Sequence, residues 1–380
     1  MTELAKSLGK RIRDRRKKLG LTQKAFAGLC GFNSLQIVSS IEKGERGIKA
    51  WELSRIADSL KVEIREFFEK MPVSVAPSVL WRQKPDKDQK LIEAAFLKLC
   101  DRYHHVEKLC GIEVPCKLTE IPPIEVEWDS FEYSDVDSLI QTIGPILNLG
   151  SRPAASLVRV LEERCGVKIF HQELEDGSAA SIIGEFGPAI LMNRNEAPWR
   201  RNYNFAHELF HLITWRSIPS NLSTEKSSLW DEMEKLANHF ASRLLLPLDV
   251  LEMELGKAIE DNRIRYIDLV NIARDFEVST EALLWRSVSL RFLNRREAEK
   301  VINDPKFKEL DRATMHEKWW DPPPLPERFV RLAFSAYVKG RLSRMKLAEY
   351  LNTSLIDLED TLAGYGIEEG AGYETQISIA

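Results

Sequence analysis

Three residues in the middle of the chain have the types and spacing of a metal site. His207, Glu208 and His211 form the pattern H-E-x-x-H within the largely apolar stretch 204–214. If that stretch is helical, residues four apart lie on one face, so both imidazoles can reach one metal ion. Glu208 lies one position round the helix, where its carboxylate can contact a water molecule on the metal. A motif this short also arises by chance, so its function depends on whether another part of the chain supplies a further metal ligand.

A third ligand is expected from the next strong helical pattern, residues 229–246. Catalytic zinc usually has three protein ligands and leaves a fourth position for water. One face of this helix carries Glu234, Ala237, Asn238 and Ala241. The small alanines allow two helices to approach closely, so Glu234 can reach the same metal. Asn238 can accept a hydrogen bond from the outer N–H of a ligand histidine. The expected cofactor is therefore Zn²⁺.

The two helical patterns together resemble the ImmA/IrrE family of metallopeptidases, a gluzincin-like group. The resemblance lies in N-F-A-H-E-L-F-H (204–211) and in E-K-L-A-N-H-F-A-S-R-L-L-L-P (234–247). It is close over about 150–250 and extends over about 80–300. Two paired motifs at this separation are much more specific than either motif alone.

The resemblance implies a zinc endopeptidase with a defined set of site residues. Glu208 is the implied general base, and the implied zinc ligands are His207, His211 and Glu234. Zinc lowers the pKa of the water that it binds, and Glu208 passes a proton from that water to the leaving amine. Phe210 and Leu236 depart from the family pattern, but neither is a ligand. Two other interpretations stay open: a helix pair with histidines buried for packing, and a decayed peptidase that only binds metal.

Several further polar residues could do chemistry, but their spacing assigns them no role. Tyr203 and His239 are close enough in sequence to be considered as oxyanion-stabilising groups, although both types more often serve packing or the surface. His171, in an expected strand, is interpreted as a surface residue. A further group is interpreted as packing because it matches no zinc-site spacing: Cys100, His104, His105 and Cys110.

The charge is distributed unevenly along the chain. Residues 1–50 contain twelve Lys and Arg against four acidic residues, a net charge of +8. The remaining 330 residues carry a net charge of −12. A basic head on an acidic body indicates that the head binds a polyanion and the body does not.

The basic head has the pattern of a helix-turn-helix unit. Five helices are expected, at 4–19, 23–30, 34–42, 49–60 and 63–70. The stretch T-Q-K-A-F-A-G-L-C-G…S-S-I-E-K-G-E-R resembles the Cro/C1-type (XRE) DNA-binding domains over roughly residues 7–70. One residue more than the usual pattern lies between Gly31 and Ser39. The partner implied by this resemblance is double-stranded DNA, and such modules usually bind two half-sites as a homodimer.

In this arrangement the start of the third helix would enter the major groove. Its expected base-contacting residues are Ser34, Gln36, Ser39 and Ser40. Gln36 is best suited among them because its amide can bond adenine in two places. The expected phosphate contacts are Gln23, Lys24, Lys43 and Arg46. The alternative is a solvated basic helix in a small protein-interaction bundle.

The order of elements predicts an α+β, mostly helical fold in several parts. Residues 1–70 form the DNA-binding domain, and the proline-containing stretch 71–83 is a linker. Residues 84–300 form a zincin-like metallopeptidase domain, and residues 301–380 form a helical C-terminal lobe with a loose tail. A small sheet packed on the H-E-x-x-H helix is expected from strands at 167–172, 179–185 and 188–193.

The cysteine content and the lack of long apolar runs favour a cytoplasmic protein. The five cysteines are odd in number and include no C-x-x-C pair, which fits reduced thiols. The N-terminus has no apolar core of a signal peptide, and no run of 18 apolar residues occurs. Cytoplasmic location and no membrane partner are therefore expected.

Two functions from different classes fit these features. The first is a DNA-binding transcriptional regulator with a zinc endopeptidase domain, which cleaves a regulatory protein, a helix-turn-helix repressor by the family resemblance. The second is a non-proteolytic transcription factor or antitoxin, in which the zincin fold serves as a sensor or a dimerisation module. Both use the same DNA-binding head, so only the chemistry at Glu208 separates them.

Overall fold

The computed structural model describes residues 3–68, 79–113, 118, 121, 124–218, 228–261, 263–314 and 320–368. These residues form two compact units, and each is described by itself. The first contains the N-terminal helices and residues 84–102, and the second contains residues 79–83 and the chain from Tyr103 onward. The expected α+β, mostly helical fold is confirmed. Most of the expected linker, 71–78, and of the tail, 369–380, lies outside the described residues.

The first unit begins with the five helical segments expected from the sequence. They are α1 (Glu3–Lys18), α2 (Gln23–Leu29), α3 (Leu35–Glu42), α4 (Ala50–Ser59) and the short 3-10 helix η1 (Ile64–Phe67). Thr22 caps α2, because its side chain accepts a hydrogen bond from the Ala25 N–H, and Ser34 caps α3 in the same way through the Gln36 N–H. The core of the unit includes Ile12, Phe26, Val38, Ile41 and Ile56.

Helices α1 and α3 are held together by a glycine contact and a buried ion pair. A Cβ atom on Gly9 would lie 2.3 Å from the Ile41 carbonyl oxygen, so only glycine allows this approach. Arg16 contacts both carboxylate oxygens of Glu42, at 2.5 and 3.0 Å. Gln23 Nε2 donates to the same carboxylate at 2.9 Å, which satisfies the buried charge further.

The helix that follows β1, α5 (Gln89–Leu109), is divided between the two units. Lys98 Nζ donates to the Val62 carbonyl oxygen at 3.2 Å, and Arg102 Nε lies 3.1 Å from Glu63 Oε1. These contacts explain why residues 84–102 group with the N-terminal helices, although the sequence placed them with the second domain.

The second unit contains one four-stranded sheet within the described residues. Its strands are β1 (Leu80–Trp81), β2 (Lys168–Gln172), β3 (Ala179–Gly184) and β4 (Gly187–Asn193), in the order β1-β3-β4-β2. β3 pairs antiparallel with β1 and β4, whereas β2 and β4 are parallel. The three expected strands are therefore confirmed. β1 was not expected, because two residues are too short to show an alternating pattern.

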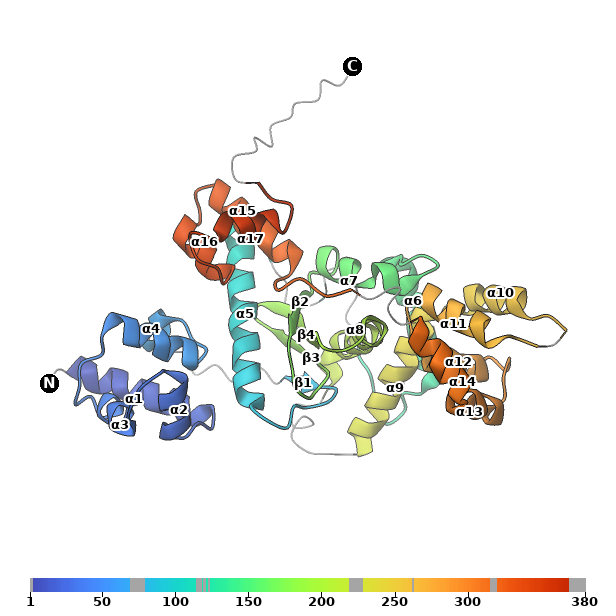
Figure 1. Cartoon of the computed structure of the whole chain (residues 1–380), viewed down its shortest axis with the longest axis horizontal. Coiled ribbons are helices and arrows are strands. Elements are labelled where there is room, and N and C mark those ends of the chain that lie inside the picture. Colours follow the sequence, from blue (N-terminus) through green and yellow to red (C-terminus); the bar gives the residue numbers. More distant parts are fainter. Residues whose placement is uncertain are drawn as a thin grey trace, which may run out of the picture. The chain divides into compact units, whose positions relative to one another are not determined.

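The sheet is covered by helices, of which α8 and α9 matter most for the site. α8 (Pro198–Ile213) packs against β3, β4 and α9 (Ser228–Leu245), as can be followed in Figure 1. The other segments are α6 (Tyr133–Leu147), α7 (Pro153–Glu163), η2 (Trp215–Ser217), α10 (Leu248–Ala258), α11 (Tyr266–Asp275), α12 (Thr280–Ser289), α13 (Arg295–Asn303), α14 (Pro305–Ala313), α15 (Glu327–Val338), α16 (Arg344–Tyr350) and α17 (Leu358–Ala363). No helix in the described ranges is long and apolar enough to cross a membrane.

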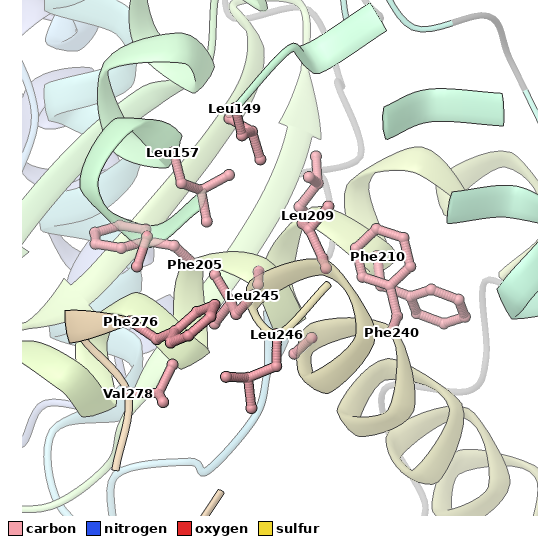
Figure 2. Close-up of a cluster of buried hydrophobic side chains, with 14 of the residues drawn as sticks. Leu149, Leu157, Phe205, Leu209, Phe210, Phe240, Leu245, Leu246, Phe276 and Val278 are labelled. Carbon is pink, nitrogen blue, oxygen red and sulfur yellow. The ribbon is translucent and has the colours of Figure 1, made fainter. Parts of the chain in front are cut away.

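The main core surrounds α8 on several sides. Figure 2 shows Phe205, Leu209 and Phe210 of α8 among side chains that include Phe240 and Leu245 of α9. These five side chains are fully buried. Burial of each such side chain stabilises the fold by about 1.5–3 kcal/mol. Helix α8 is therefore a rigid support for polar side chains on its remaining face.

A buried cluster of charges joins three elements of the second unit. Glu107, at the end of α5, is 2.8 Å from Lys168 Nζ on β2 and 2.7 Å from Arg328 Nη1 on α15. Arg328 also donates to the Tyr103 hydroxyl at 2.9 Å. Glu107 and Lys168 are 1% and 0% exposed, so the carboxylate balances an ammonium charge that water cannot reach, together with the partly buried guanidinium of Arg328.

Candidate metal centre

Helices α8 and α9 bring three expected ligands to one point. His211 Nε2 is 3.1 Å from His207 Nε2 and 3.1 Å from Glu234 Oε1, and His207 Nε2 is 3.3 Å from Glu234 Oε2. Both histidines are buried, and Glu234 is half-buried. Across the described part of the chain, this is the only group of three His, Cys, Asp or Glu side chains close enough to hold a metal ion. The 3.6-residue period of α8 and the small residues of α9 make this convergence possible, since Ala237 and Ala241 are completely buried.

Asn238 of α9 lies beside His207 of α8. Its Oδ1 is 3.2 Å from His207 Nδ1. A proton on His207 Nδ1 leaves a lone pair on Nε2 for the metal. On the other side of the centre, the Trp230 ring stacks on His211 with 5.6 Å between centroids and 5° between planes. Both histidines are thus contacted by residues of α9.

The three residues of the cluster shift one another's pKa values. Burial lowers the pKa of His207 to about 4, which keeps its imidazole neutral. Burial also lowers the pKa of His211, but the adjacent Glu234 outweighs burial and raises it above its ordinary value. Burial opposes ionisation of Glu234, yet its hydrogen bonds to His207 and His211 hold its pKa well below the usual range. The cluster therefore presents a carboxylate and two imidazoles to a cation.

Glu208 is placed to act as a base beside this cluster. Its side chain is completely buried, and Ser181 on β3 lies near enough to act on its pKa, but no well-formed hydrogen bond to either carboxylate oxygen is present among the described residues. Burial raises its pKa to about 7, while His211 opposes the increase. A group with a pKa near neutrality can both accept and release a proton at physiological pH. This buried carboxylate and the two-histidine, one-glutamate donor set fit a catalytic zinc site.

Arg82 and Asn204 also reach this region, and the sequence assigned a role to neither. Arg82 Nη1 donates to Asn204 Oδ1 at 2.7 Å, and its Nη2 donates to Asn238 Oδ1 at 3.2 Å. The contacts span 122 and 156 residues of sequence. The family resemblance extends to about residue 80, but no local spacing connects Arg82 to a metal site.

Tyr203 and His239, considered for oxyanion stabilisation, are engaged elsewhere. The Tyr203 hydroxyl donates to the Asn238 carbonyl oxygen at 2.7 Å. His239 Nε2 lies 3.0 Å from Asp137 Oδ1, in a cluster with Arg243. Neither side chain contacts a ligand residue in these interactions.

His171 lies on β2 of the sheet and is less exposed than a surface residue. Its ring contacts Phe205 and Trp320, with centroids 5.8 and 6.3 Å apart. Burial lowers its pKa to about 3, and the positive charges of Arg201 and Arg194 add to this effect. His171 is therefore neutral in the folded protein at physiological pH.

The low pKa of His171 predicts a loss of stability in mild acid. The unfolded chain has an ordinary histidine pKa near 6.5, so below that pH it binds the proton that the folded protein excludes. As the pH falls from 6 to 4, the free energy of unfolding of the wild type should decrease more steeply than that of His171→Gln. The difference between the two slopes should be about 1.4 kcal/mol per pH unit. Urea unfolding of both proteins at several pH values measures this difference. Equal pH slopes would contradict the assignment.

The expected DNA-contacting residues divide into exposed and internally engaged groups. Lys24, Gln36 and Lys43 are exposed, and Ser39 is half-buried. Four others make internal contacts: Ser34 caps α3, Ser40 Oγ donates to the Gln36 carbonyl oxygen, Gln23 bonds Glu42, and Arg46 bonds Glu52 at 2.6 Å. Among these exposed residues, Gln36 is the one whose long polar side chain lies on the first turn of α3.

Comparisons with known protein families match two separate parts of the chain. Residues 12–67 match the family model described as helix-turn-helix, and residues 162–287 match the M78 peptidase model described as IrrE N-terminal-like domain. The second match contains His207, Glu208 and His211 on α8 and Glu234 and Asn238 on α9. No curated protein matches the chain.

Several solved structures show a weak likeness over the whole chain. Apo ComR from S. thermophilus has 13% identity and a TM-score of 0.17, covering 95% of this chain and 94% of that one. PlcR from Bacillus thuringiensis, solved with the peptide PapR7 and DNA, has 13% identity and a TM-score of 0.16, covering 95% and 97%. Apo ComR from Streptococcus vestibularis has 12% identity and a TM-score of 0.17, covering 96% and 100%. Scores this low carry no argument about fold or function.

The two family matches agree with the two resemblances noted in the sequence. One match covers the N-terminal helices, and the other covers the part of the chain that contains α8 and α9. The chain therefore joins an XRE-type helix-turn-helix domain at 12–67 to an IrrE N-terminal-like domain of the M78 peptidase family at 162–287.

Proposed function

We propose that the protein is a transcriptional regulator that binds double-stranded DNA as a homodimer and cleaves a regulatory protein with a zinc-dependent peptidase site. The substrate class is a repressor of the helix-turn-helix type, and the reaction takes place in the cytoplasm. The observation that carries the proposal is the convergence of His207, His211 and Glu234 beside the buried carboxylate of Glu208. The match of 162–287 to a peptidase family supports the same reaction class.

The side chains of the site divide the work of peptide hydrolysis. Zn²⁺ in a site of this kind acts as a Lewis acid and lowers the pKa of water. His207, His211 and Glu234 would hold the ion, and Asn238 keeps the outer nitrogen of His207 protonated. Glu208 accepts a proton from the attacking water and then donates one to the leaving nitrogen.

Zinc analysis combined with a cleavage assay tests this proposal. The full-length protein should contain one zinc per chain and should cleave at least one helix-turn-helix repressor encoded near its gene. A chelator should stop cleavage, and His211→Ala should remove both zinc and cleavage. Zinc-loaded protein that binds DNA but leaves every such repressor intact would overturn the peptidase assignment. That result would favour a sensor or dimerisation role for the zincin fold.

Substitutions at two residues of the first unit are expected to affect DNA binding in different ways. Gln36→Ala should weaken binding by about 1–3 kcal/mol at one base pair and relax specificity there, because a bidentate contact to adenine is lost. Lys43→Ala should weaken binding to all sequences and reduce the slope of log K against log salt by about 1. Fluorescence anisotropy with an operator selected from random DNA measures both.

Lys339→Ala is the matched control for the charge change. Lys339 is an exposed residue at the end of α15, outside the helix-turn-helix domain. Equal weakening by Lys339→Ala and Lys43→Ala would show that general charge, rather than docking of α3, determines binding.

A further inference from the structure

Arg82 connects the first strand of the sheet to both helices of the metal centre. It follows β1 directly, and its backbone N–H donates to the Ala179 carbonyl oxygen at 3.0 Å. β1 itself pairs with β3 through Leu80 and Trp81. The guanidinium then reaches Asn204 on α8 and Asn238 on α9, at 2.7 and 3.2 Å. A side chain outside the two metal-binding helices is thus bonded to each of them.

The bond to Asn238 determines which atom of that amide faces the ligand histidine. Arginine can only donate hydrogen bonds, whereas an asparagine amide has a donating and an accepting end. Because Arg82 donates to Asn238 Oδ1, the oxygen must occupy the position that also faces His207 Nδ1, 3.2 Å away. His207 must then carry its proton on Nδ1. Its Nε2, which lies among the other ligand atoms, keeps a lone pair for a cation.

The bond to Asn204 fixes the position of the guanidinium. Asn204 Oδ1 accepts from Arg82, so its Nδ2 is left to donate, and it contacts Ser178 Oγ at 2.8 Å and Glu196 Oε2 at 2.5 Å. The Tyr203 ring lies 5.5 Å from the guanidinium carbon. With the amide of Asn204 oriented and an aromatic face beside it, the guanidinium has one position in which both of its bonds form.

We propose that Arg82 is a positioning residue of the metal centre, which orients the Asn238 amide and thereby fixes the protonated nitrogen of His207. Without Arg82 the amide of Asn238 can rotate and present its NH₂ group to His207 Nδ1. The proton of His207 would then move to Nε2, the atom needed for the metal. The inference rests on the proposed metal centre, and it adds a residue that lies some 120 positions before the H-E-x-x-H motif.

The test is a double-mutant cycle on zinc affinity in the full-length protein. Arg82→Met removes the donors, and Asn238→Asp replaces the amide by a group that offers only acceptors. Competition with a chromophoric chelator should show that Arg82→Met raises the zinc Kd about 10- to 100-fold in the wild-type background. In the Asn238→Asp background the same change should have a much smaller effect, because the introduced carboxylate fixes the His207 proton without Arg82.

Arg200→Met provides a matched control. Arg200 lies on α8 and forms an ion pair with Glu196 at 3.3 Å, but it is 63% exposed and is not bonded to Asn238. Its zinc Kd should equal that of the wild type. Thermal unfolding of the zinc-free proteins shows whether each variant keeps its fold.

The outcomes separate a positioning role from a structural one. An unchanged zinc Kd in Arg82→Met overturns the proposal, and so does an equal loss of affinity in both backgrounds, which is the result expected from general destabilisation. The readout does not require peptide cleavage. Absence of cleavage with an Arg82-dependent zinc Kd would therefore contradict the proposed function and leave the role of Arg82 supported.

Discussion

Glu208→Gln is expected to reduce the rate of peptide cleavage by a factor of about 10²–10⁴, the contribution of a positioned general base. Glutamine has almost the same shape as glutamate but cannot accept the proton of the attacking water. Zinc content and operator affinity should stay at wild-type values, because Glu208 is not among the three converging ligand residues and lies outside the first unit. Single-turnover cleavage and metal analysis on the same preparations measure both effects.

The control for this experiment is Glu234→Gln, which changes the same functional group on the other helix. Glu234 lies 3.1–3.3 Å from the two ligand histidines, so its replacement should lower zinc content as well as cleavage. The two variants therefore differ in zinc content although both are inactive. Cleavage by Glu208→Gln at the wild-type rate would exclude Glu208 as the base.

Glu107→Gln is expected to lower the free energy of unfolding of the second unit by about 3–5 kcal/mol. The change leaves the Lys168 ammonium and the Arg328 guanidinium without their shared carboxylate, and Lys168 is 0% exposed. A buried charge that loses its partner cannot recover the hydration that it gave up on folding. Urea unfolding monitored by tryptophan fluorescence measures the loss.

An exposed ion pair that also involves α15 supplies the comparison. Arg331 contacts Glu163, and their side chains are 54% and 42% exposed. Glu163→Gln should therefore cost less than about 1 kcal/mol. If both substitutions had the same small effect, the Glu107 cluster would not be important for attaching α15 to the sheet.

The position of each ligand residue on its helix could be predicted because helical periodicity is local. His207 and His211 lie four residues apart on α8, and this spacing alone places both imidazoles on one face. Glu234 and Asn238 are related in the same way on α9. The helix-turn-helix segments were predictable for a similar reason, since caps such as Thr22 and Ser34 act within three residues of themselves.

Contacts between distant segments could not be predicted, because no pattern within a single element marks them. β1 has only two residues, so no alternation marked it as a strand, and it lies within the expected linker. Lys98 and Arg102 look like ordinary charges on the surface of a helix, and only their contacts with the segment 62–63 show that this part of α5 groups with the N-terminal helices. Glu107, Lys168 and Arg328 likewise show no common pattern in the sequence.

The sequence by itself determined the candidate metal ligands, the helices that carry them and the helix-turn-helix head, because each depends on spacing within one element or on composition. Only the tertiary structure decided that α8 and α9 bring ligand atoms of His207, His211 and Glu234 within 4.8 Å of one another and bury Glu208 completely. It also brought Arg82 to the centre across more than a hundred residues. The physical reason is that a pKa, a buried carboxylate or a fixed amide depends on what surrounds a side chain, and packing between distant segments determines those surroundings.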